Sequence, residues 1–378
     1  MRIAIITDSL RTGGAEGQAV LTAGELRRRG HHAELISYHP GNDFSEYIRT
    51  RGIRWVRIEA GGLLRIGRIR ALAAHLRDGR FDIAHCFGAF PSITGSLAAA
   101  LVGVPPVGAC RVEYRESASL RIAHKTVDRF VARWVVNSQG IADTFMRATG
   151  IQPDKCVVVY NGIDLETFRS SLGPAQAKER IGVDPGDNVV SIIAQLRPQK
   201  NHPLFLELAS RILSSRSDVR FLVVGDGTLR PSLEDRARSL GIADRVLFLG
   251  NRGDVADILS ATDVSVLTSH YEGLANALVE SMAMKVPVVT TDYLGADEIV
   301  TDGRDGFIVA RGDGAALADK VCSLLDNPEL CQSMGRCGRQ AVETRFSAQA
   351  MCRNLLSVYE SCLESVGRRP TAPLESTT

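Results

Sequence analysis

Short apolar runs alternate with helical segments along almost the whole chain, and this alternation restricts the fold more than any other feature. Continuous apolar runs are typical of strands buried on both faces of a parallel sheet. At this spacing, the alternation predicts βαβ units and parallel sheets covered by helices. The runs are AELIS, DIAHCF, PPVGAC, RWVV and CVVVY in the first half, and VRFLVVG, RVLFLG, DVSVLT, VPVVTT and GFIVA in the second.

The two halves of the chain begin in the same way. Residues 2–7 (RIAIIT) form an apolar run, followed by a glycine-rich loop and a helical pattern that ends near Arg29. Residues 188–196 (NVVSIIAQL) repeat this plan, with a polar loop and a helix over about 204–213. We therefore expect an α/β protein of two Rossmann-like domains that face each other across a cleft, with ligands bound at the carboxyl ends of the strands.

A polar, helix-poor stretch after YNGID marks the boundary between these domains. We expect an N-terminal, acceptor-side domain over residues 1–165 and a C-terminal, donor domain over residues 166–346. Residues 347–366 should form a final helix that returns to the N-terminal domain. Residues 367–378 are polar and contain prolines, and we expect a disordered tail there.

Composition and charge exclude several classes of protein. Hydrophobic residues make up 44% and charged residues 23% of the 378 residues, which is ordinary for a globular protein. The net charge of +2 does not indicate a nucleic-acid-binding protein. The eight cysteines form no C-x-x-C pair, so we expect reduced thiols, no metal site and a cytoplasmic location. The most apolar window, residues 93–109, is shorter than the ~20 residues that cross a bilayer.

Positive charge is nevertheless concentrated between Arg49 and Arg80. Nine arginines lie there against two acidic residues, Glu59 and Asp78, a local excess of seven charges. Basic residues near anionic lipid contribute on the order of 1 kcal/mol each, which would suit peripheral contact with the inner face of a membrane. The solvated face of an ordinary βα unit explains the same charges, and both interpretations stay open.

The most informative local pattern spans residues 268–292 (TSHYEGLANALVESMAMKVPVVTTD). Seven residues separate Glu272 from Glu280, and a helix is expected to begin near Leu274. A helix start provides free backbone N–H groups and a positive dipole end, which suit a diphosphate. A carboxylate two turns into the helix can accept paired hydrogen bonds from a ribose diol. Taken alone, the same two glutamates would be read as a capping residue and a solvated helix position.

The surrounding sequence resembles the retaining, two-domain GT-B glycosyltransferases of the large family-4, group 1 type. Their signature has the form EGLPN…LEAMA.G.PVV, and this chain has EGLAN…VESMAMKVPVV. The resemblance continues through VGDGTLR, FLGNRGDVADILSATDVSVLTS, DGRDGFIV, the GGAE element at residues 13–16, and VVNSQ…KCVVVYNGID. It covers nearly the whole chain except the tail. It implies transfer of a hexose from a nucleotide diphosphate sugar to a glycan or lipid-linked acceptor, as in polysaccharide biosynthesis, without a metal or cofactor.

The resemblance also implies roles for individual residues of the second half. Glu280 should hold the ribose hydroxyls, and Glu272 should lie near the transferred sugar. Lys200 should neutralise diphosphate charge as the bond to the leaving nucleotide breaks. The backbone N–H groups expected to contact the sugar or the diphosphate are those of Gly273, Leu274, Ala275 and Asn276.

Further donor contacts are implied by three loops. Gly14, in the first loop of the other domain, should approach the β-phosphate because it has no side chain. Asn251 lies where the family frames the nucleobase. Gly225 and Gly227 either line the donor pocket or shape a tight turn.

Two departures from the family pattern matter, and the first concerns the loop after the first strand of the second domain. The family usually has Gly-Arg-Leu…Lys there, whereas residues 194–200 read AQLRPQK. The usual arginine position therefore holds Gln195. We expect Arg197, two residues further on, to supply the missing positive charge.

The second departure lies after PPVGAC, where some members have a histidine near the acceptor. This chain has Arg111 there, followed by Glu113 and Arg115. Arg111 and His85, at the end of DIAH, are the acceptor-side candidates. A histidine that packs in the core or anchors a loop explains His85 equally well.

Two other functions remain as alternatives. A nucleotide-sugar epimerase of similar fold would need carboxylates and a histidine around the sugar ring, and its motifs do not match. A non-catalytic nucleotide-sugar-binding protein would not need Lys200, Glu272 and Glu280 together. In the transferase, the leaving diphosphate itself can assist deprotonation of the acceptor, so no separate nucleophile–base pair is required. The donor is a UDP-, GDP- or ADP-linked hexose.

Overall fold

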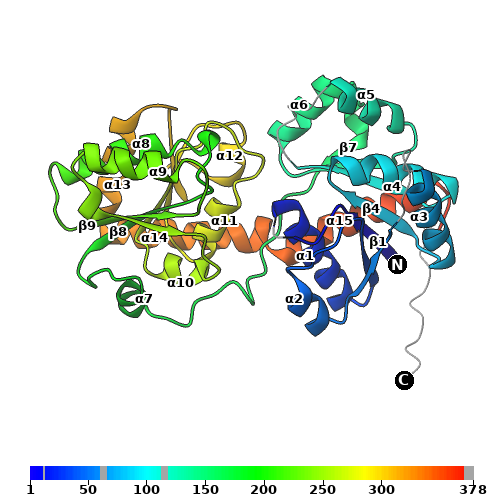
Figure 1. The fold of residues 1–378 in the computed structure, drawn as a ribbon, viewed down its shortest axis with the longest axis horizontal. Helices are drawn as coiled ribbons and strands as arrows, with labels where there is room; N and C mark the ends of the chain where they lie inside the picture. Colours follow the sequence, from blue (N-terminus) through cyan, green and yellow to red (C-terminus); the bar gives the residue numbers. More distant parts are fainter. Residues whose placement is uncertain (12, 60–65, 112–117, 370–378) are drawn as a thin grey trace. The chain divides into compact units, whose positions relative to one another are not determined.

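The computed structural model describes residues 1–11, 13–59, 66–111 and 118–369. The chain forms two compact units (Figure 1). The first comprises Met1–Gly162 together with the segment that begins at Ala348, and the second comprises Ile163–Ser347. Glu113 and Arg115, which follow the acceptor-side candidate Arg111, lie outside the described residues, as do residues 370–378 of the predicted tail.

The described part of the first unit contains a seven-stranded parallel sheet with strand order β3-β2-β1-β4-β5-β6-β7. The predicted parallel α/β organisation is therefore confirmed. The strands are β1 (Arg2–Thr7), β2 (His32–Ser37), β3 (Arg54–Arg57), β4 (Ile83–Phe87), β5 (Pro106–Cys110), β6 (Arg133–Val136) and β7 (Cys156–Val158).

Helices connect these strands and cover both faces of the sheet. Ile3 and Ile5 of β1 share a core cluster with residues of α1 and α15, whereas Ala4 and Ile6 face a cluster that includes α3 and α4. This alternation follows from the two-residue period of a strand. The helices are α1 (Gly14–Arg28), α2 (Ser45–Thr50), α3 (Ile66–Asp78), α4 (Ala89–Leu101), α5 (Ala118–Val127), α6 (Gln139–Thr149) and α15 (Ala348–Ser365).

The last helix, α15, belongs to the first unit, as expected. It packs beside α1 (Figure 1), and the side chains of Leu355 and Tyr359 are fully buried in the core that β1 begins. The chain therefore completes this core with residues that lie almost at its far end.

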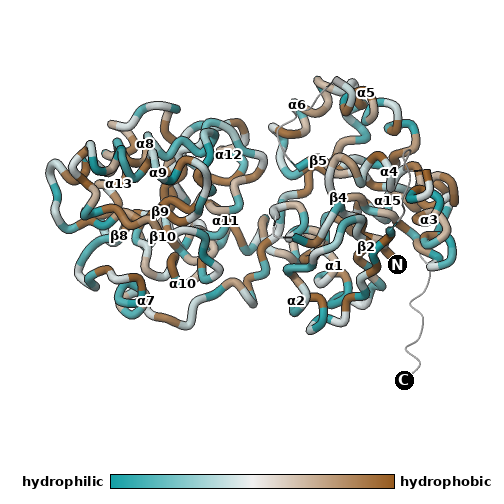
Figure 2. The backbone as a smooth tube through the Cα atoms, viewed as in Figure 1, coloured by the Kyte–Doolittle hydropathy of each residue, from teal (hydrophilic) through white to brown (hydrophobic). Residues whose placement is uncertain are grey.

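The second unit contains a six-stranded parallel sheet with strand order β10-β9-β8-β11-β12-β13. Figure 2 shows apolar stretches along β8 and β9, and both strands contribute fully buried residues such as Val189 and Leu222. The strands are β8 (Asn188–Ile193), β9 (Val219–Val224), β10 (Val246–Gly250), β11 (Val264–Leu267), β12 (Val288–Thr291) and β13 (Gly306–Val309).

The helices of the second unit follow these strands in turn. The predicted helix over 204–213 begins two residues earlier, at His202, with Pro203 in its first turn, where the missing N–H of proline has no partner to lose. The helices are α7 (Pro174–Arg180), α8 (His202–Leu213), α9 (Arg230–Ser239), α10 (Val255–Ser260), α11 (Asn276–Ala283), α12 (Ala296–Ile299), α13 (Gly314–Leu325) and α14 (Pro328–Ala341).

In each unit, the two segments through which the chain passes to the other unit are in contact with each other. In the first unit, the side-chain amide of Gln18 donates to the Gly162 carbonyl and accepts from the Gly162 N–H, both at 2.9 Å. A Cβ on Gly162 would lie 2.9 Å from the Cα of Ala348, so these segments touch. In the second unit, the Ile163 N–H donates to the Phe346 carbonyl at 2.8 Å.

Candidate functional site

Lys200 and Glu272 meet at the carboxyl end of the sheet in the second unit. Lys200 ends a 3₁₀ helix (Pro198–Lys200) after β8, and Glu272 follows β11, the neighbouring strand. The Lys200 Nζ donates to the Glu272 Oε1 at 2.5 Å. Glu272 is only 7% exposed and Lys200 20%, so this ion pair is largely shielded from water. Two residues predicted to act on the donor are thus brought into direct contact.

Hydroxyl groups that the sequence analysis did not single out hold this pair in place. The Ser269 Oγ donates to the same Glu272 oxygen at 2.5 Å. The Thr268 Oγ1 contacts the carbonyls of Lys200 at 2.9 Å and Asn201 at 3.0 Å. Two small hydroxyl residues directly after a buried strand were the available signal. The loops that carry the lysine and the glutamate are therefore fixed to each other.

The chain just before α11 presents unsatisfied backbone donors. The helix begins at Asn276 rather than near Leu274, and its N-cap, Ala275, provides no side-chain cap. Within the described residues, the N–H groups of Gly273, Leu274 and Ala275 have no acceptor. Consecutive free N–H groups at the positive end of a helix favour an anion such as a phosphate.

Glu280 lies in the second turn of α11. No hydrogen bond or ion pair to its carboxyl group occurs in the described part of the chain. Burial raises its pKa to about 7, because a poorly solvated carboxyl group favours its neutral form. The carboxyl oxygens are therefore available to accept hydrogen bonds from a ligand.

Gln195 and Arg197 are both exposed, and neither side chain has a partner among the described residues. The Arg197 N–H donates to the Gln195 carbonyl at 2.8 Å, and the Lys200 N–H donates to the Arg197 carbonyl at 3.0 Å. Arg197 is thus a free cation on the same loop as Lys200. The structure does not bring its side chain into contact with Lys200 or Glu272.

Gly225 and Gly227 shape the loop after β9. A Cβ on Gly225, whose φ is +136°, would overlap the Ala194 carbonyl, and a Cβ on Gly227 would lie 2.5 Å from the Leu196 carbonyl oxygen. Glycine is therefore required at both positions so that this loop can pack against the loop after β8.

Asn251 follows β10 and is exposed. The preceding residue, Gly250, accepts a hydrogen bond from the Gly225 N–H at 2.8 Å, so the loops after β9 and β10 lie together. The contact of Asn251 with a nucleobase stays a prediction.

In the first unit, Gly14 is the first residue of α1 and is exposed. A Cβ at this position would meet nothing within 4 Å. No atom of the described residues thus demands glycine here, whereas a closely approaching phosphate would. That approach stays a prediction.

His85 is fully buried in β4, and its Nδ1 lies 2.7 Å from the Tyr359 hydroxyl of α15. Its ring stacks against Phe87 with the centroids 4.3 Å apart. Burial, assisted by the charge of Arg111, lowers its pKa well below the ordinary value, so His85 is neutral. These contacts anchor α15 to the sheet. A catalytic role for His85 stays a prediction.

Arg111 directly follows β5. Its Nη1 donates to the Asn161 Oδ1 at 2.6 Å, and its Cζ lies 4.6 Å from the centroid of the Phe87 ring. Both acceptor-side candidates, Arg111 after β5 and His85 in the middle of β4, thus contact Phe87 and belong to one cluster.

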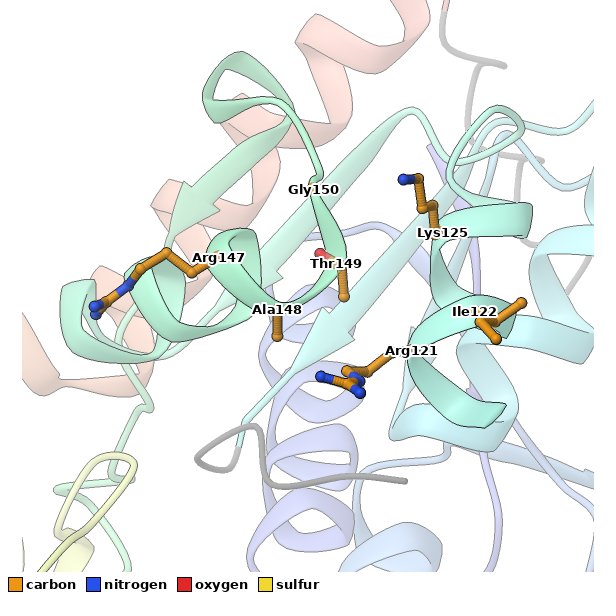
Figure 3. A pocket seen from close by; sticks show the side chains of 7 residues that line it. All are labelled: Arg121, Ile122, Lys125, Arg147, Ala148, Thr149 and Gly150. Carbon is orange, nitrogen blue, oxygen red and sulfur yellow. The ribbon is translucent and has the colours of Figure 1, made fainter. Parts of the chain in front are cut away.

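A separate hollow of about 400 Å³ lies between α5 and α6 and contains none of the predicted site residues. Arg121 and Lys125 of α5 point into it, whereas Ile122 and Arg147 point away (Figure 3). Among the described residues, no cluster of histidine, cysteine and acidic side chains could hold a metal ion. No described helix is long and apolar enough to span a membrane.

Known protein families match both halves of the chain. Residues 12–167 match the family described as Glycosyltransferase Family 4, and residues 175–341 match Glycosyl transferases group 1. Among solved structures, Anabaena Alr3699/HepE in complex with UDP has a TM-score of 0.85 at 21% identity, over 96% of this chain and 100% of that chain. Its complex with UDP-glucose has a TM-score of 0.81 at 22% identity, over 97% and 99% of the two chains.

Curated relatives carry more specific names. The D-inositol 3-phosphate glycosyltransferase of Streptomyces scabiei is 31% identical over 71% of this chain and 65% of its own length. The UDP-Gal:alpha-D-GlcNAc-diphosphoundecaprenol alpha-1,3-galactosyltransferase of Escherichia coli is 29% identical over 68% of this chain and 69% of its own length. The matches to two other relatives cover only 59% and 61% of their lengths.

Two Rossmann-like α/β units, with an anion-favouring loop beside a lysine–glutamate pair in the second, define a protein of the GT-B fold. Both family matches agree with this fold and follow each other in the expected order. The chain belongs to the GT-B glycosyltransferases of the family-4, group 1 type.

Proposed function

We propose that this protein is a retaining glycosyltransferase that transfers a hexose from a nucleoside diphosphate sugar to a glycan or lipid-linked acceptor. The observation that carries the proposal is the Lys200–Glu272 pair next to three unsatisfied backbone N–H groups before α11. A cation and a cluster of N–H donors on one edge of a parallel sheet are suited to a diphosphate.

Different residues of the second unit bind different parts of the donor. The diphosphate binds to the N–H groups of Gly273, Leu274 and Ala275, and it draws Lys200 away from Glu272. Glu280 accepts hydrogen bonds from the ribose hydroxyls, since its carboxyl group has no partner in the described chain. Glu272, once released, faces the hexose.

Transfer then exchanges one carbon–oxygen bond for another. The bond from the anomeric carbon to the diphosphate breaks, and the acceptor oxygen forms a bond to that carbon on the same face of the ring. The proton of the acceptor hydroxyl passes to an oxygen of the leaving diphosphate. Lys200 and Arg197 stabilise the negative charge that develops on this leaving group, which is where electrostatic contacts accelerate a reaction.

The proposed reaction needs no metal ion, because Lys200, Arg197 and the start of α11 supply positive charge to the diphosphate. Turnover should therefore survive EDTA. Loss of turnover on chelation, with recovery on adding Mg²⁺ or Mn²⁺, would contradict this part of the proposal.

A UDP-linked hexose is the first donor to test, since similar solved structures are complexes with UDP and with UDP-glucose and one relative is named for UDP-Gal. The protein is incubated with UDP-glucose or UDP-galactose and a lipid-diphosphate sugar acceptor. A product with the anomeric configuration of the donor, detected by NMR, supports the proposal. Conversion of the donor without an acceptor would instead identify an epimerase, and binding without turnover would identify a non-catalytic protein.

The contributions of the two main donor contacts should be separable. Glu280→Ala should weaken nucleotide-sugar binding, whereas Lys200→Ala should lower turnover more than binding, because the charge on the diphosphate increases in the transition state. Rates equal to the wild type in both variants would refute the site.

A further inference from the structure

Three neighbouring parallel strands of the first unit, β5, β6 and β7, are followed by polar side chains at one edge of the sheet, and the adjacent strand β4 carries a histidine at its middle. His85 lies in β4, Arg111 follows β5, Asn137 follows β6, and Asn161 follows β7. The Asn137 Nδ2 donates to the Arg111 carbonyl at 3.2 Å, and the Arg111 Nη1 donates to the Asn161 Oδ1 at 2.6 Å. The edge formed by the carboxyl ends of parallel strands is where ligands bind in such folds.

The guanidinium of Arg111 is only half satisfied. Its Nη1 has an acceptor, but its Nε and Nη2 are inaccessible to solvent and have no hydrogen-bond partner in the part of the chain that the structure describes. Nε and Nη2 carry the two parallel N–H bonds on one side of the planar group, which match the two oxygens of a carboxylate or phosphate. Buried polar groups without partners are rare in proteins, and each one requires an explanation.

The charge of Arg111 is also uncompensated within the described residues. It forms no ion pair there, and its hydrogen-bonding partner is a neutral amide. Burial lowers its pKa to about 10, and the groups that oppose this shift are Tyr359 and Cys110. Burial raises the pKa of Tyr359 well above its ordinary value, so this hydroxyl is uncharged at neutral pH, whereas Arg111 remains charged.

Other polar atoms of this cluster are unsatisfied as well. The Nε2 of His85 and the Oδ1 of Asn137 are buried without partners, and the two side chains are 0% and 2% exposed. Of these two atoms only the His85 Nε2, as its N–H tautomer, can donate to an oxyanion, because the Asn137 Oδ1 only accepts hydrogen bonds. The open N–H groups of Arg111 therefore define the side of the cluster that suits an oxyanion.

We propose that Arg111 is the cation of an oxyanion subsite in the first unit, at which its Nε–H and Nη2–H groups bind a phosphate or carboxylate of a ligand. The proposed function makes this ligand the acceptor, so the acceptor carries an anionic group on its docking portion. The identity of the ligand as the acceptor rests on the proposed function, whereas the subsite itself does not.

The subsite is tested by calorimetric titration of the full chain with inorganic phosphate. Arg111→Gln, which removes the charge, should weaken phosphate binding at least tenfold, as expected for loss of a charge-assisted bidentate contact. Arg353→Gln, a matched change at an exposed arginine of α15 whose side chain has no hydrogen-bond or ion-pair partner in the described chain, should leave the affinity unchanged. Arg111→Lys keeps the charge without the planar fork and should give an intermediate affinity.

Three measurements make the result decisive. Cooperative thermal unfolding of Arg111→Gln shows that the variant is folded. Titration with UDP measures binding at the proposed donor site of the second unit, so a failure of the proposed function is recognised independently of the phosphate result. Lys200→Gln should retain the phosphate site of the first unit. Loss of phosphate binding in Lys200→Gln but not in Arg111→Gln would overturn the proposal.

Glu113 must be tested directly because it lies outside the described residues. If Glu113→Gln increases phosphate affinity tenfold or more, the chain supplies its own counter-ion and the proposal fails. Titration with glucose 6-phosphate and with glucuronate, against glucose as a neutral control, distinguishes a phosphate from a carboxylate ligand. Equal affinities of the protein for glucose and for both anions would also overturn the proposal.

Discussion

At the scale of single residues, the second unit combines a paired lysine with an unpaired carboxyl group. Lys200 already has a partner in Glu272, so a diphosphate must compete with an existing ion pair. Glu280 has no partner among the described residues, and its burial disfavours the charged form. A ligand must therefore break the Lys200–Glu272 ion pair to bind Lys200, whereas it can bind the Glu280 carboxyl group without breaking a contact among the described residues.

The raised pKa of Glu280 should make stability depend on pH. The ordinary pKa of a glutamate side chain, 4.5, applies to the unfolded chain, whereas the pKa in the folded protein is about 7. The folded state therefore holds more protons between these values, and its stability falls as pH rises through that window. Glu280→Gln should be more stable than the wild type at about pH 8, by roughly 1–3 kcal/mol, and equally stable at about pH 4. Urea unfolding at both pH values measures this; equal stability at the higher pH would contradict it.

The departure at Gln195 leads to a second prediction at this scale. Arg197 is an exposed cation without a partner in the described chain, whereas Gln195 can donate a hydrogen bond but cannot neutralise charge. Arg197→Ala should lower turnover by about 10²-fold or more, the effect of losing one transition-state charge contact. Gln195→Ala should cost much less. Steady-state rates of both variants decide the matter, and equal losses would show that Arg197 does not replace the usual arginine.

Some residue contacts could be predicted from the sequence and others could not. The approach of Lys200 to Glu272 could be anticipated because the ends of β8 and β11 share one edge of a parallel sheet. The bond from Tyr359 to His85 could not, because 273 residues separate them and nothing local indicates it. The role of Thr268 was missed for a similar reason, since its acceptors are backbone carbonyls, which leave no trace in the sequence.

At the scale of elements, apolar runs identified the buried strands, but the edge strand β3 was missed. Arginines occupy both ends of this four-residue strand and are exposed, so it has no continuous apolar run. An edge strand has a neighbouring strand on one side only, so fewer of its residues have to be apolar. Charged residues on such a strand also discourage pairing with other chains. The start of α11 was placed two residues early because Glu-Gly resembles a helix entry, whereas Ala275 is the cap.

The charges around α2 and α3 give a prediction at this scale. Several of these arginines have acidic partners: Arg54 pairs with Glu34, Arg57 with Glu59, and Arg77 with Asp78. Arg49 and Arg70 are exposed and have no partner in the described chain.

If this region contacts an anionic membrane, the double variant Arg49→Gln/Arg70→Gln should bind phosphatidylserine vesicles at least tenfold more weakly, since each cation contributes about 1 kcal/mol. Co-sedimentation at low salt measures this. The variant Arg121→Gln/Lys125→Gln, which removes the cations of the hollow in Figure 3, should bind like the wild type. The reverse result would place the contact at α5, and no vesicle binding by the wild type would remove the idea.

At the scale of the whole molecule, the core of the first unit depends on α15. The side chains of Met351, Leu355 and Tyr359 are almost completely buried against residues of α1 and β1. A chain that stops at Ser347 should therefore expose this apolar face, lose cooperative unfolding of the first unit and aggregate.

A milder version of this test keeps the helix. Tyr359→Phe removes only the hydroxyl that contacts His85, so it should cost about 1–2 kcal/mol in the free energy of unfolding. Calorimetry of the full chain measures this change.

For the truncation at Ser347, a protein that still unfolds in two separate cooperative transitions would refute the dependence on α15.

The position of α15 also determines the order in which the molecule can be assembled during translation. Residues 163–347 leave the ribosome before α15 does, so the second unit can finish folding while the first still lacks one side of its core. The strands of the first unit therefore remain partly exposed until α15 has been synthesised. The early part of the chain therefore spends the longest time without its complete core, and incompletely packed segments are the ones that chaperones and proteases recognise.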